Sequence, residues 1–212
     1  MPMSPPVSFY YHTNKRSVSG HPLVFLHGSG RTESDSADFL AQLSLHTEAV
    51  FIRGQHSQTP GYTFVRRNDD LSLDYDEIAG DAKDLAGFLV HLTLQNPNWQ
   101  KPPVLIGYSS GAIMAAAILW HYRDLIAGAV LLRPQSPSME RPAPLKGLPV
   151  LMLSGLWDER RDADASLHLE IQLEQARAKV THVTLRTGHG EAEDGSDFSV
   201  TKRWLEETFS IR

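Results

Sequence analysis

The chain has 212 residues, of which 41% are hydrophobic and 21% charged, and its formal net charge is −5. This length and composition predict one globular domain over residues 1–212 that can bury a sizeable core without disulfides. The acidic balance argues against nucleic acid as a partner, because such a partner requires a basic surface. No apolar run is long enough to span a bilayer, so we expect no membrane insertion.

The first residues of the chain carry little information about structure. Residues 1–6 are rich in proline, and we expect them to be extended or disordered. The start has neither the basic nor the apolar region of a signal peptide. The sequence also contains no cysteine, which removes disulfides and thiolate metal ligands. Together these features predict a cytoplasmic protein.

Strands and helices alternate along the rest of the chain. Short apolar runs predict strands, and apolar residues at helical spacing predict helices. The expected strands are 7–12, 21–27, 49–53, 104–106, 126–132, 148–153 and 180–186. The expected helices are 36–45, 75–94, the apolar segment that follows Ser109, 163–178 and 197–209. This order predicts an α/β fold, a doubly wound and mostly parallel sheet of about seven strands, with 7–12 at one edge.

One polar segment, 54–73, interrupts the alternation. It contains glycine, proline and paired charges, and a loop of this length in a compact domain is usually functional or mobile. Its side chains Tyr62, Phe64, Arg66 and Arg67 make it a candidate for one wall of a substrate site.

The stretch 101–123 has the pattern of a strand, a tight turn and a buried helix. Its turn reads Gly107-Tyr108-Ser109-Ser110-Gly111, which is a Gly-x-Ser-x-Gly pattern. A serine on such a turn is strained, and glycines two positions away let the flanking backbones pass. The backbone N–H of Ser110 would lie at a helix N-terminus, where a developing negative charge is favoured. A plain structural turn is the alternative interpretation.

Three residue types needed for nucleophilic catalysis follow three of the predicted strands. Sites in doubly wound sheets form at the carboxyl ends of the strands, and there we find Ser109, Asp158 and His189. A serine nucleophile needs a base, and the base needs a carboxylate to hold its tautomer. The order serine, acid, histidine is that of α/β-hydrolases. We therefore predict Ser109 as nucleophile, Asp158 as acid and His189 as base.

Some assignments have alternatives. Asp158 is also a candidate N-cap of the next helix, in which case Glu159 or Asp162 would be the acid. His182 lies in the middle of a predicted strand and is interpreted as a structural residue. His27 precedes a glycine-rich turn and is better suited to ordering that loop than to ionising.

Metal and nucleotide sites find no support in the sequence. No metal-binding spacing of histidines occurs, and the acidic residues after His189 resemble a solvated face. No Gly-x-Gly-x-x-Gly pattern opens a helix after a strand. We expect neither a metal nor a cofactor.

Five motifs carry a resemblance to a known family: LHGSG (26–30), GYSSGA (107–112), AVLLRPQSP (129–137), PVLMLSGLWD (149–158) and GHG (188–190). On these motifs the chain resembles the small α/β-hydrolases of the phospholipase/carboxylesterase group, in particular short carboxylesterases found beside hydroquinone dioxygenases. The similarity covers nearly the whole chain. It implies an α/β-hydrolase fold, and the short connection between the strands ending at 132 and starting at 148 predicts that no large lid covers the site.

The resemblance also implies residue roles. Ser109, Asp158 and His189 would form the catalytic triad, and the backbone N–H groups of Ser29 and Ser110 would form the oxyanion hole. Relatives commonly have asparagine where this chain has Ser110, which matters little for a backbone donor. They also commonly have proline directly after the acid, where this chain has Glu159-Arg160-Arg161, which makes the geometry of the acid's loop less predictable.

The function expected is hydrolysis of short- to medium-chain carboxylic esters through an acyl-enzyme intermediate. The alternatives are a thioesterase or lysophospholipase with the same triad, or a non-catalytic small-molecule binder of this fold. Arg66, Arg67 and Arg133 are candidates for binding a substrate carboxylate, with exposed loop charges as the alternative. The expected partner is a small ester, and relatives of this type favour a homodimer.

Overall fold

The structure is a computed structural model that describes residues 8–14, 20–97, 99–161 and 164–211. The prediction that residues 1–6 are extended or disordered concerns a segment outside these ranges.

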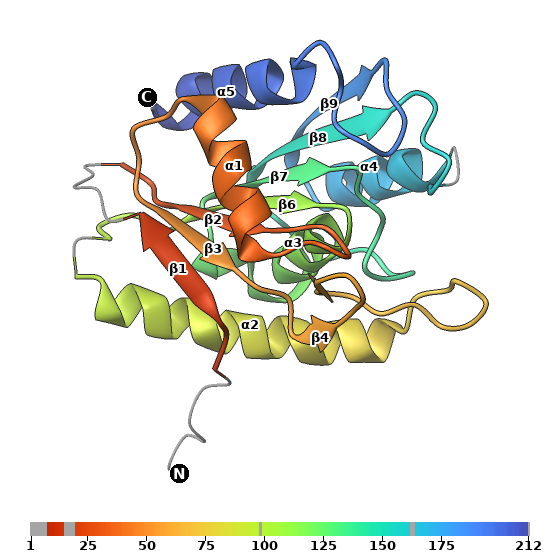
Figure 1. The fold of residues 1–212 in the computed structure, drawn as a ribbon, viewed down its shortest axis with the longest axis horizontal. Coiled ribbons are helices and arrows are strands. Elements are labelled where there is room, and N and C mark those ends of the chain that lie inside the picture. Colours follow the sequence, from red (N-terminus) through yellow and green to blue (C-terminus); the bar gives the residue numbers. More distant parts are fainter. Residues whose placement is uncertain (1–7, 15–19, 98, 162–163, 212) are drawn as a thin grey trace.

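A seven-stranded sheet runs through the middle of the molecule (Figure 1). Its strands, in spatial order, are β1 (Tyr11–Asn14), β3 (Ala49–Ile52), β2 (Leu23–Leu26), β6 (Val104–Tyr108), β7 (Gly128–Leu132), β8 (Pro149–Gly155) and β9 (Lys179–Leu185). Strand β1 pairs antiparallel with β3, and the other neighbours pair in parallel. The predicted doubly wound, mostly parallel sheet is confirmed.

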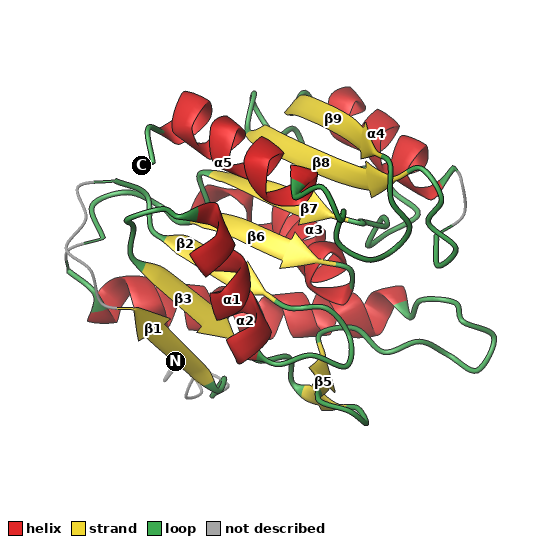
Figure 2. Cartoon of the chain, turned by 45° about the horizontal axis from the view of Figure 1, so that its top comes forward, coloured by secondary structure: helices red, strands yellow, loops and turns green. Residues whose placement is uncertain are grey.

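Helices cover both faces of this sheet (Figure 2). Helices α1 (Glu33–Leu43) and α5 (Ser196–Phe209) pack on one face. Helices α2 (Tyr75–Gln95), α3 (Ser110–Tyr122) and α4 (Ala165–Gln175) pack on the other, and a 3₁₀ turn at Arg123–Leu125 follows α3. Parallel sheets covered in this way need strands that are apolar on both faces, which explains the continuous apolar runs in the sequence.

The core divides into two layers because successive strand residues point to opposite faces. In β2, Val24 and Leu26 face α2 and α3, whereas Leu23 and Phe25 face α1 and α5. Helix α3 is buried from its first residue through Trp120, in agreement with its all-round apolar sequence. It lies behind the centre of the sheet.

Several element boundaries differ from the predictions. The first strand covers Tyr11–Asn14, and its register on β3 pairs Tyr11 with Ile52. Of the predicted range 7–12, residues 8–10 lie before this strand, and residue 7 is outside the described residues. Helix α1 begins at Glu33, three residues earlier than expected. The backbone N–H of Thr32 donates to the Asp35 carboxylate (2.8 Å), so the helix start is set by capping rather than by the apolar pattern.

The segment 54–73 is not a simple loop. It contains a small antiparallel hairpin of β4 (His56–Ser57) and β5 (Tyr62–Thr63), too short to give a periodic pattern in the sequence. Between β7 and β8 the chain forms only turns and bends, in agreement with the prediction of no large lid. Among the described residues, none of the helices combines the length and the apolar character needed to cross a bilayer.

Candidate active site

The central feature of the site is the turn between β6 and α3. Ser109 adopts φ 53° and ψ −107°, a conformation that is strained for a residue with a side chain. Its backbone N–H donates to the carbonyl of Leu132 (2.9 Å), and its carbonyl accepts from the N–H of Ile113 (3.0 Å). These two bonds hold the strained backbone in place, so that Ser109 lies at the carboxyl end of the sheet.

The glycines around Ser109 are required by close backbone contacts. A Cβ atom on Gly107 would lie 2.3 Å from the carbonyl oxygen of Gly111, and one on Gly111 would lie 2.1 Å from the carbonyl oxygen of Leu26. Both distances are far below van der Waals contact, and both partners are backbone atoms that cannot move aside. The Gly-x-Ser-x-Gly pattern therefore reflects the tight passage of α3 behind β2 and β6.

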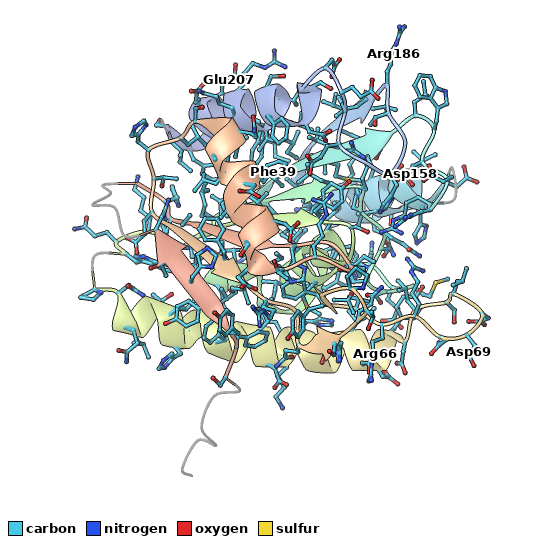
Figure 3. All side chains as sticks on the ribbon, in the orientation of Figure 1. Phe39, Arg66, Asp69, Asp158, Arg186 and Glu207 are labelled. Atoms are coloured by element: carbon cyan, nitrogen blue, oxygen red, sulfur yellow. The ribbon has the colours of Figure 1, made fainter. Side chains whose placement is uncertain are left out.

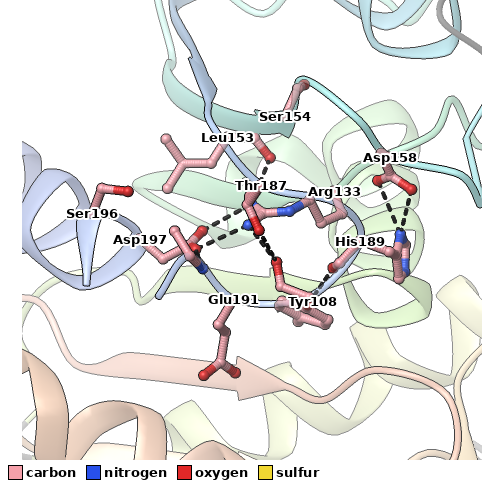
Figure 4. A network of polar contacts seen from close by, with 12 residues as sticks. Tyr108, Arg133, Leu153, Ser154, Asp158, Thr187, His189, Glu191, Ser196 and Asp197 are labelled. Carbon is pink, nitrogen blue, oxygen red and sulfur yellow. Dashed lines mark hydrogen bonds and ion pairs between the residues drawn. The ribbon is translucent and has the colours of Figure 1, made fainter. Parts of the chain in front are cut away.

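Ser109, His189 and Asp158 form a continuous chain of hydrogen bonds. The hydroxyl of Ser109 lies 2.8 Å from Nε2 of His189, and Nδ1 of His189 lies 2.9 Å from each carboxylate oxygen of Asp158 (Figure 4 shows the second contact). Since a carboxylate only accepts, Nδ1 carries the proton and Nε2 is free to accept from the serine. This is the tautomer that a general base requires.

The protonation state of His189 is set mainly by burial, since only 7% of its surface is exposed. Burial lowers the pKa of His189 below its usual value, and the hydrogen bond to Asp158 opposes this shift in part. The imidazole is therefore neutral at pH 7 and able to take a proton.

The structure distinguishes among the candidate acids. Asp158 accepts from the backbone N–H of Arg160 (2.9 Å) as well as from His189. The N-cap of α4 is Asp164, so Asp158 is not the cap of that helix. Glu159 lines the neighbouring cleft without a hydrogen bond to His189, and Asp162 lies outside the described residues.

Ser29 and Ser110, the two predicted oxyanion-hole residues, both border the cleft beside Ser109. Ser110 is the first residue of α3, so its N–H is one of the donors left unpaired at a helix start. The Ser110 hydroxyl is buried and has no hydrogen-bond partner within the described part of the chain. The Ser29 hydroxyl bonds to Thr63 (2.9 Å), which ties its loop to β5.

His27 orders this loop. Its Nε2 accepts from the N–H of Gly54 (3.0 Å), so Nδ1 carries the proton and donates to the carbonyl of Gly28 (2.8 Å). Burial lowers the pKa of His27, and the side chain stays neutral. These contacts agree with the expectation that His27 shapes the loop and does not ionise.

Arg133 lies in the interior, and the prediction that it contacts substrate is wrong. It forms a two-pronged ion pair with Asp197 (2.8 and 2.9 Å), and both side chains are fully buried. It also donates to the carbonyls of Gly188 (3.2 Å) and Gly190 (2.8 Å), on either side of His189 (Figure 4). Arg133 therefore positions the loop that carries His189.

Tyr108 supports the same loop from the other side. Its hydroxyl donates to the backbone carbonyl of His189 (Figure 4). Burial raises the pKa of Tyr108 to about 12, so the hydroxyl keeps its proton and remains a donor. This role has no signal in the sequence, because the turn pattern accepts any residue at the position before the serine.

A cleft of about 1090 Å³ opens in front of Ser109. The loop between β5 and α2 forms one wall, and Figure 3 shows Arg66 on this loop with Asp69 at its outer end. Arg66 pairs with Glu77, and Arg67 donates to Gln135 (2.7 Å) across the cleft. Both predicted arginines therefore line the cleft, and each is already bonded to another side chain of the protein.

The two aromatic residues predicted for this wall lie elsewhere. Phe64 is buried against the ring of His27, with 5.0 Å between ring centroids. The guanidinium carbon of Arg53 lies over the ring of Tyr62, 4.6 Å from the ring centroid. Neither residue lines the cleft.

Arg161 is a site residue that was not predicted from the sequence. Its Nη2 lies 3.1 Å from the hydroxyl oxygen of Ser109, and its Nε donates to the carbonyl of Arg133 (3.2 Å). Burial lowers the pKa of Arg161 to about 10, which leaves it charged at pH 7. The available signal was the unusual Glu159-Arg160-Arg161 run after the acid.

A second serine–histidine–carboxylate chain lies away from the turn. The Ser154 hydroxyl contacts Nε2 of His182 (2.8 Å), whose Nδ1 contacts Glu170 (2.8 Å). Ser154 lies within β8, so it has neither a strained turn nor a helix N-terminus beside it. A serine nucleophile requires donors for the oxyanion, so this arrangement is structural.

One group of His and acidic residues has metal-like spacing. The ligand atoms of His56, Glu77 and Asp81 lie within 4.8 Å of one another. His56 bonds to Asp81 (2.6 Å) and Glu77 pairs with Arg66, so these groups already satisfy one another. The group is an ion-pair cluster on α2 and β4, and none of its three residues borders the cleft in front of Ser109.

Comparison with known proteins finds similarity to hydrolases over most of the chain. No family model matches the chain. The chain is 26% identical to a protein of Bacillus subtilis (strain 168) named "Putative hydrolase MhqD", over 84% of this chain and 90% of that protein. The structure of a carboxylesterase from Bacillus cereus superposes with a TM-score of 0.88 at 27% identity, covering 95% of both chains.

A carboxylesterase from Mesorhizobium loti shares the same fold at 22% identity, with a TM-score of 0.84 over 93% of this chain and 94% of that chain. The chain therefore has the α/β-hydrolase fold and is similar to carboxylesterases of that type.

Proposed function

We propose that the protein is a serine carboxylesterase that cleaves short- to medium-chain carboxylic esters through an acyl-enzyme intermediate. The observation that carries this proposal is the hydrogen-bonded chain from Ser109 through His189 to Asp158, at the edge of an open cleft. The similarity to a Bacillus cereus carboxylesterase and to a Bacillus subtilis hydrolase supports a carboxylic ester hydrolase.

In the first half of the reaction, Nε2 of His189 takes the hydroxyl proton of Ser109 as its oxygen attacks the ester carbonyl carbon. The carbonyl oxygen becomes negative and rests against the backbone N–H groups of Ser29 and Ser110. His189 then donates its new proton to the leaving alcohol oxygen, and the carbon–oxygen bond breaks. Asp158 stabilises the imidazolium while it exists.

In the second half, water attacks the acyl-enzyme and passes a proton to His189. The tetrahedral intermediate collapses, the bond to Ser109 breaks, and the serine oxygen takes the proton back. The carboxylic acid leaves. Both halves use the same groups, so the loops that hold His189 and the oxyanion donors matter as much as the triad itself.

The cleft supports the preference for short and medium acyl groups. No helix or strand lies between β7 and β8 to cover the site with a long apolar tunnel. The cleft is lined by polar and charged side chains as well as by Val65, Leu73 and Ile113. A long acyl chain would leave apolar surface in water here, which lowers the gain from binding it.

A serine-reactive fluorophosphonate tests the proposal directly. Intact-mass spectrometry with peptide mapping is expected to find one adduct, on Ser109. Ser154→Ala is the matched control and should be labelled as fast as the wild type, because Ser154, His182 and Glu170 are not among the residues that line the cleft. An adduct on Ser154, or no adduct on folded protein, would contradict the assignment, and the second result would favour the non-catalytic binder.

Ser109→Ala is expected to abolish hydrolysis of p-nitrophenyl acetate while the protein stays folded. The substitution removes the nucleophile but keeps the backbone bonds of the turn. Turnover is measured by absorbance and folding by circular dichroism. Unchanged turnover would end the assignment of Ser109. Esters and thioesters of graded chain length then separate a carboxylesterase from a thioesterase or lysophospholipase.

Location and assembly are further parts of this proposal. We expect a cytoplasmic protein that forms a homodimer, on the resemblance to small hydrolases of this type. Cell fractionation and light scattering of the purified protein measure the two properties.

A further inference from the structure

Arg161 is a charged group in direct contact with the candidate nucleophile. Its Nη2 lies 3.1 Å from the Ser109 hydroxyl oxygen, which also bonds to His189. Besides the serine, ester hydrolysis by the triad needs only the imidazole, the carboxylate and two backbone donors, so the guanidinium of Arg161 is not required for it. Because this guanidinium contacts the nucleophilic oxygen, it is in a position to take part in substrate binding.

Among the residues that the structure describes, the guanidinium has no carboxylate partner. Its protein acceptors are three uncharged oxygens: the carbonyls of Arg133 and Arg160 and the hydroxyl of Ser109. Within the described ranges, no acidic side chain lies at ion-pair distance from it, and the nearby Asp158 is engaged by His189. Arg161 is partly buried, and a cation withdrawn from water is costly unless it is paired. A guanidinium has five N–H donors in a planar fork that fits a carboxylate.

The surroundings of Arg161 are positive as well. Among the described residues, the cleft is bordered by four arginines, Arg66, Arg67, Arg160 and Arg161, and by two acidic residues, Asp70 and Glu159. Of these arginines, Arg66 is already paired with Glu77. This excess of arginines occurs in a chain whose formal net charge is −5. A cleft that concentrates charge opposite to that of the whole protein attracts ligands of the opposite sign.

The reaction geometry indicates which part of the substrate meets Arg161. In the tetrahedral intermediate, the carbon bound to the Ser109 oxygen carries an oxyanion, a leaving oxygen and the acyl chain. The oxyanion faces the backbone donors, and the leaving oxygen must face His189 to receive its proton. The acyl chain is the substituent for which the triad and the oxyanion donors supply no partner, and in the described part of the chain Arg161 is the remaining group in contact with the Ser109 oxygen.

We propose that Arg161 binds a carboxylate at the far end of the acyl chain, so that the preferred substrates are monoesters of short dicarboxylic acids. This inference rests on the proposed esterase function. Because Arg161 lies so close to Ser109, the spacer between the two carbonyl carbons is short, roughly one to three carbon atoms for a direct N–H···O contact. Arg161 is thus a specificity-determining residue.

The test compares two esters of the same shape and different charge. Monoethyl glutarate carries a terminal carboxylate, and the ethyl ester of glutaric acid monoamide carries a neutral amide in its place. The readout is the ratio of kcat/KM for the anionic ester to kcat/KM for the amide ester, measured by ethanol release. We expect the wild-type enzyme to prefer the anion by about 10- to 100-fold, the range of a charge-assisted hydrogen bond.

Arg161→Gln is expected to remove most of this ratio, mainly by raising KM for the anionic ester. Arg161→Lys keeps the charge without the fork and should retain part of the preference. Arg66→Gln is the matched control in the same cleft, where Glu77 already pairs the arginine, and the ratio should change little. The inference would be overturned if Arg161→Gln lowered kcat/KM equally for both esters. It would also be overturned if Arg66→Gln lost as much of the preference for the anionic ester as Arg161→Gln does.

A measurement on the wild type guards against a variant that fails to fold. Glutarate is expected to compete with the amide ester at least about tenfold more strongly than neutral glutaramide, and added salt should weaken it. Equal inhibition would contradict the role of Arg161. Turnover of the amide ester needs only the triad. If the wild-type enzyme does not hydrolyse the amide ester, the esterase proposal is contradicted. If it hydrolyses the amide ester and the anionic ester with the same kcat/KM, only the role of Arg161 is contradicted.

Discussion

Asp158 and His189 illustrate how a few hydrogen bonds set the chemical state of a side chain. Both carboxylate oxygens lie 2.9 Å from Nδ1 of His189, and the N–H of Arg160 holds the carboxylate from behind. These contacts fix which imidazole nitrogen carries the proton. Burial keeps the pKa of His189 low, so the residue is a base at pH 7 and not a fixed cation.

We predict that Asp158→Asn lowers kcat by about 10⁴-fold, because an amide at this position favours the wrong imidazole tautomer. Kinetics with p-nitrophenyl acetate measure the effect. Glu159→Gln is the neighbouring control and should lower kcat far less, because Glu159 makes no hydrogen bond to His189. A larger loss in Glu159→Gln than in Asp158→Asn would show that the acid has been assigned wrongly.

The turn between β6 and α3 shows how contacts between elements constrain the backbone. Helix α3 starts so close to β2 that the carbonyl oxygen of Leu26 occupies the space of a Cβ at position 111. The strained conformation of Ser109 is the consequence of turning from β6 into the helix within one residue. Nucleophile presentation thus depends on the packing of three elements and not on the turn alone.

Gly111→Ala is therefore predicted to lower the free energy of unfolding by about 1–3 kcal/mol, the usual cost of overpacking, and to impair turnover. Gly80→Ala is the matched control, since a Cβ at this position in α2 meets nothing within 4 Å. That change should stabilise the protein by up to about 1 kcal/mol, because alanine is the better helix former. Urea denaturation of both variants measures the difference, and equal effects would contradict this account of the turn.

Across the whole molecule, the carboxyl edge of the sheet collects polar groups from elements that are distant in sequence. Arg133, after β7, pairs with Asp197 in α5 and holds the loop after β9. His27, after β2, joins its own loop to Gly54, after β3. Breaking a buried pair such as Arg133–Asp197 typically costs about 3–5 kcal/mol, so the site and the fold are stabilised by the same bonds.

The buried neutral histidines predict a pH dependence of stability. Burial lowers the pKa of both His27 and His189, so the unfolded chain binds more protons than the folded one below about pH 6.5. Their contribution is complete above that pH and is lost as the pH falls through the lowered values. We expect the free energy of unfolding to decrease between pH 6.5 and 5, measured by urea denaturation.

His27→Gln should reduce this slope, and the exposed His46→Gln is the control that should leave it in place. Each histidine contributes at most about 1.4 kcal/mol per pH unit. An unchanged slope in His27→Gln would mean that His27 is not buried in its neutral form.

The sequence by itself determined the order of the helices and of the strands in the main sheet, the turn at Ser109 and the three residues that meet there. Apolar runs and glycine spacing are local signals, and parallel strands bring their carboxyl ends to one edge, so the sequence alone is enough to group Ser109, Asp158 and His189. Only the tertiary structure decided the roles of the arginines. An arginine after a strand looks the same in sequence whether it meets water, a substrate or a carboxylate 64 residues away, as Arg133 does. In the same way, only the folded loop after β8 brings Arg161 to the Ser109 hydroxyl.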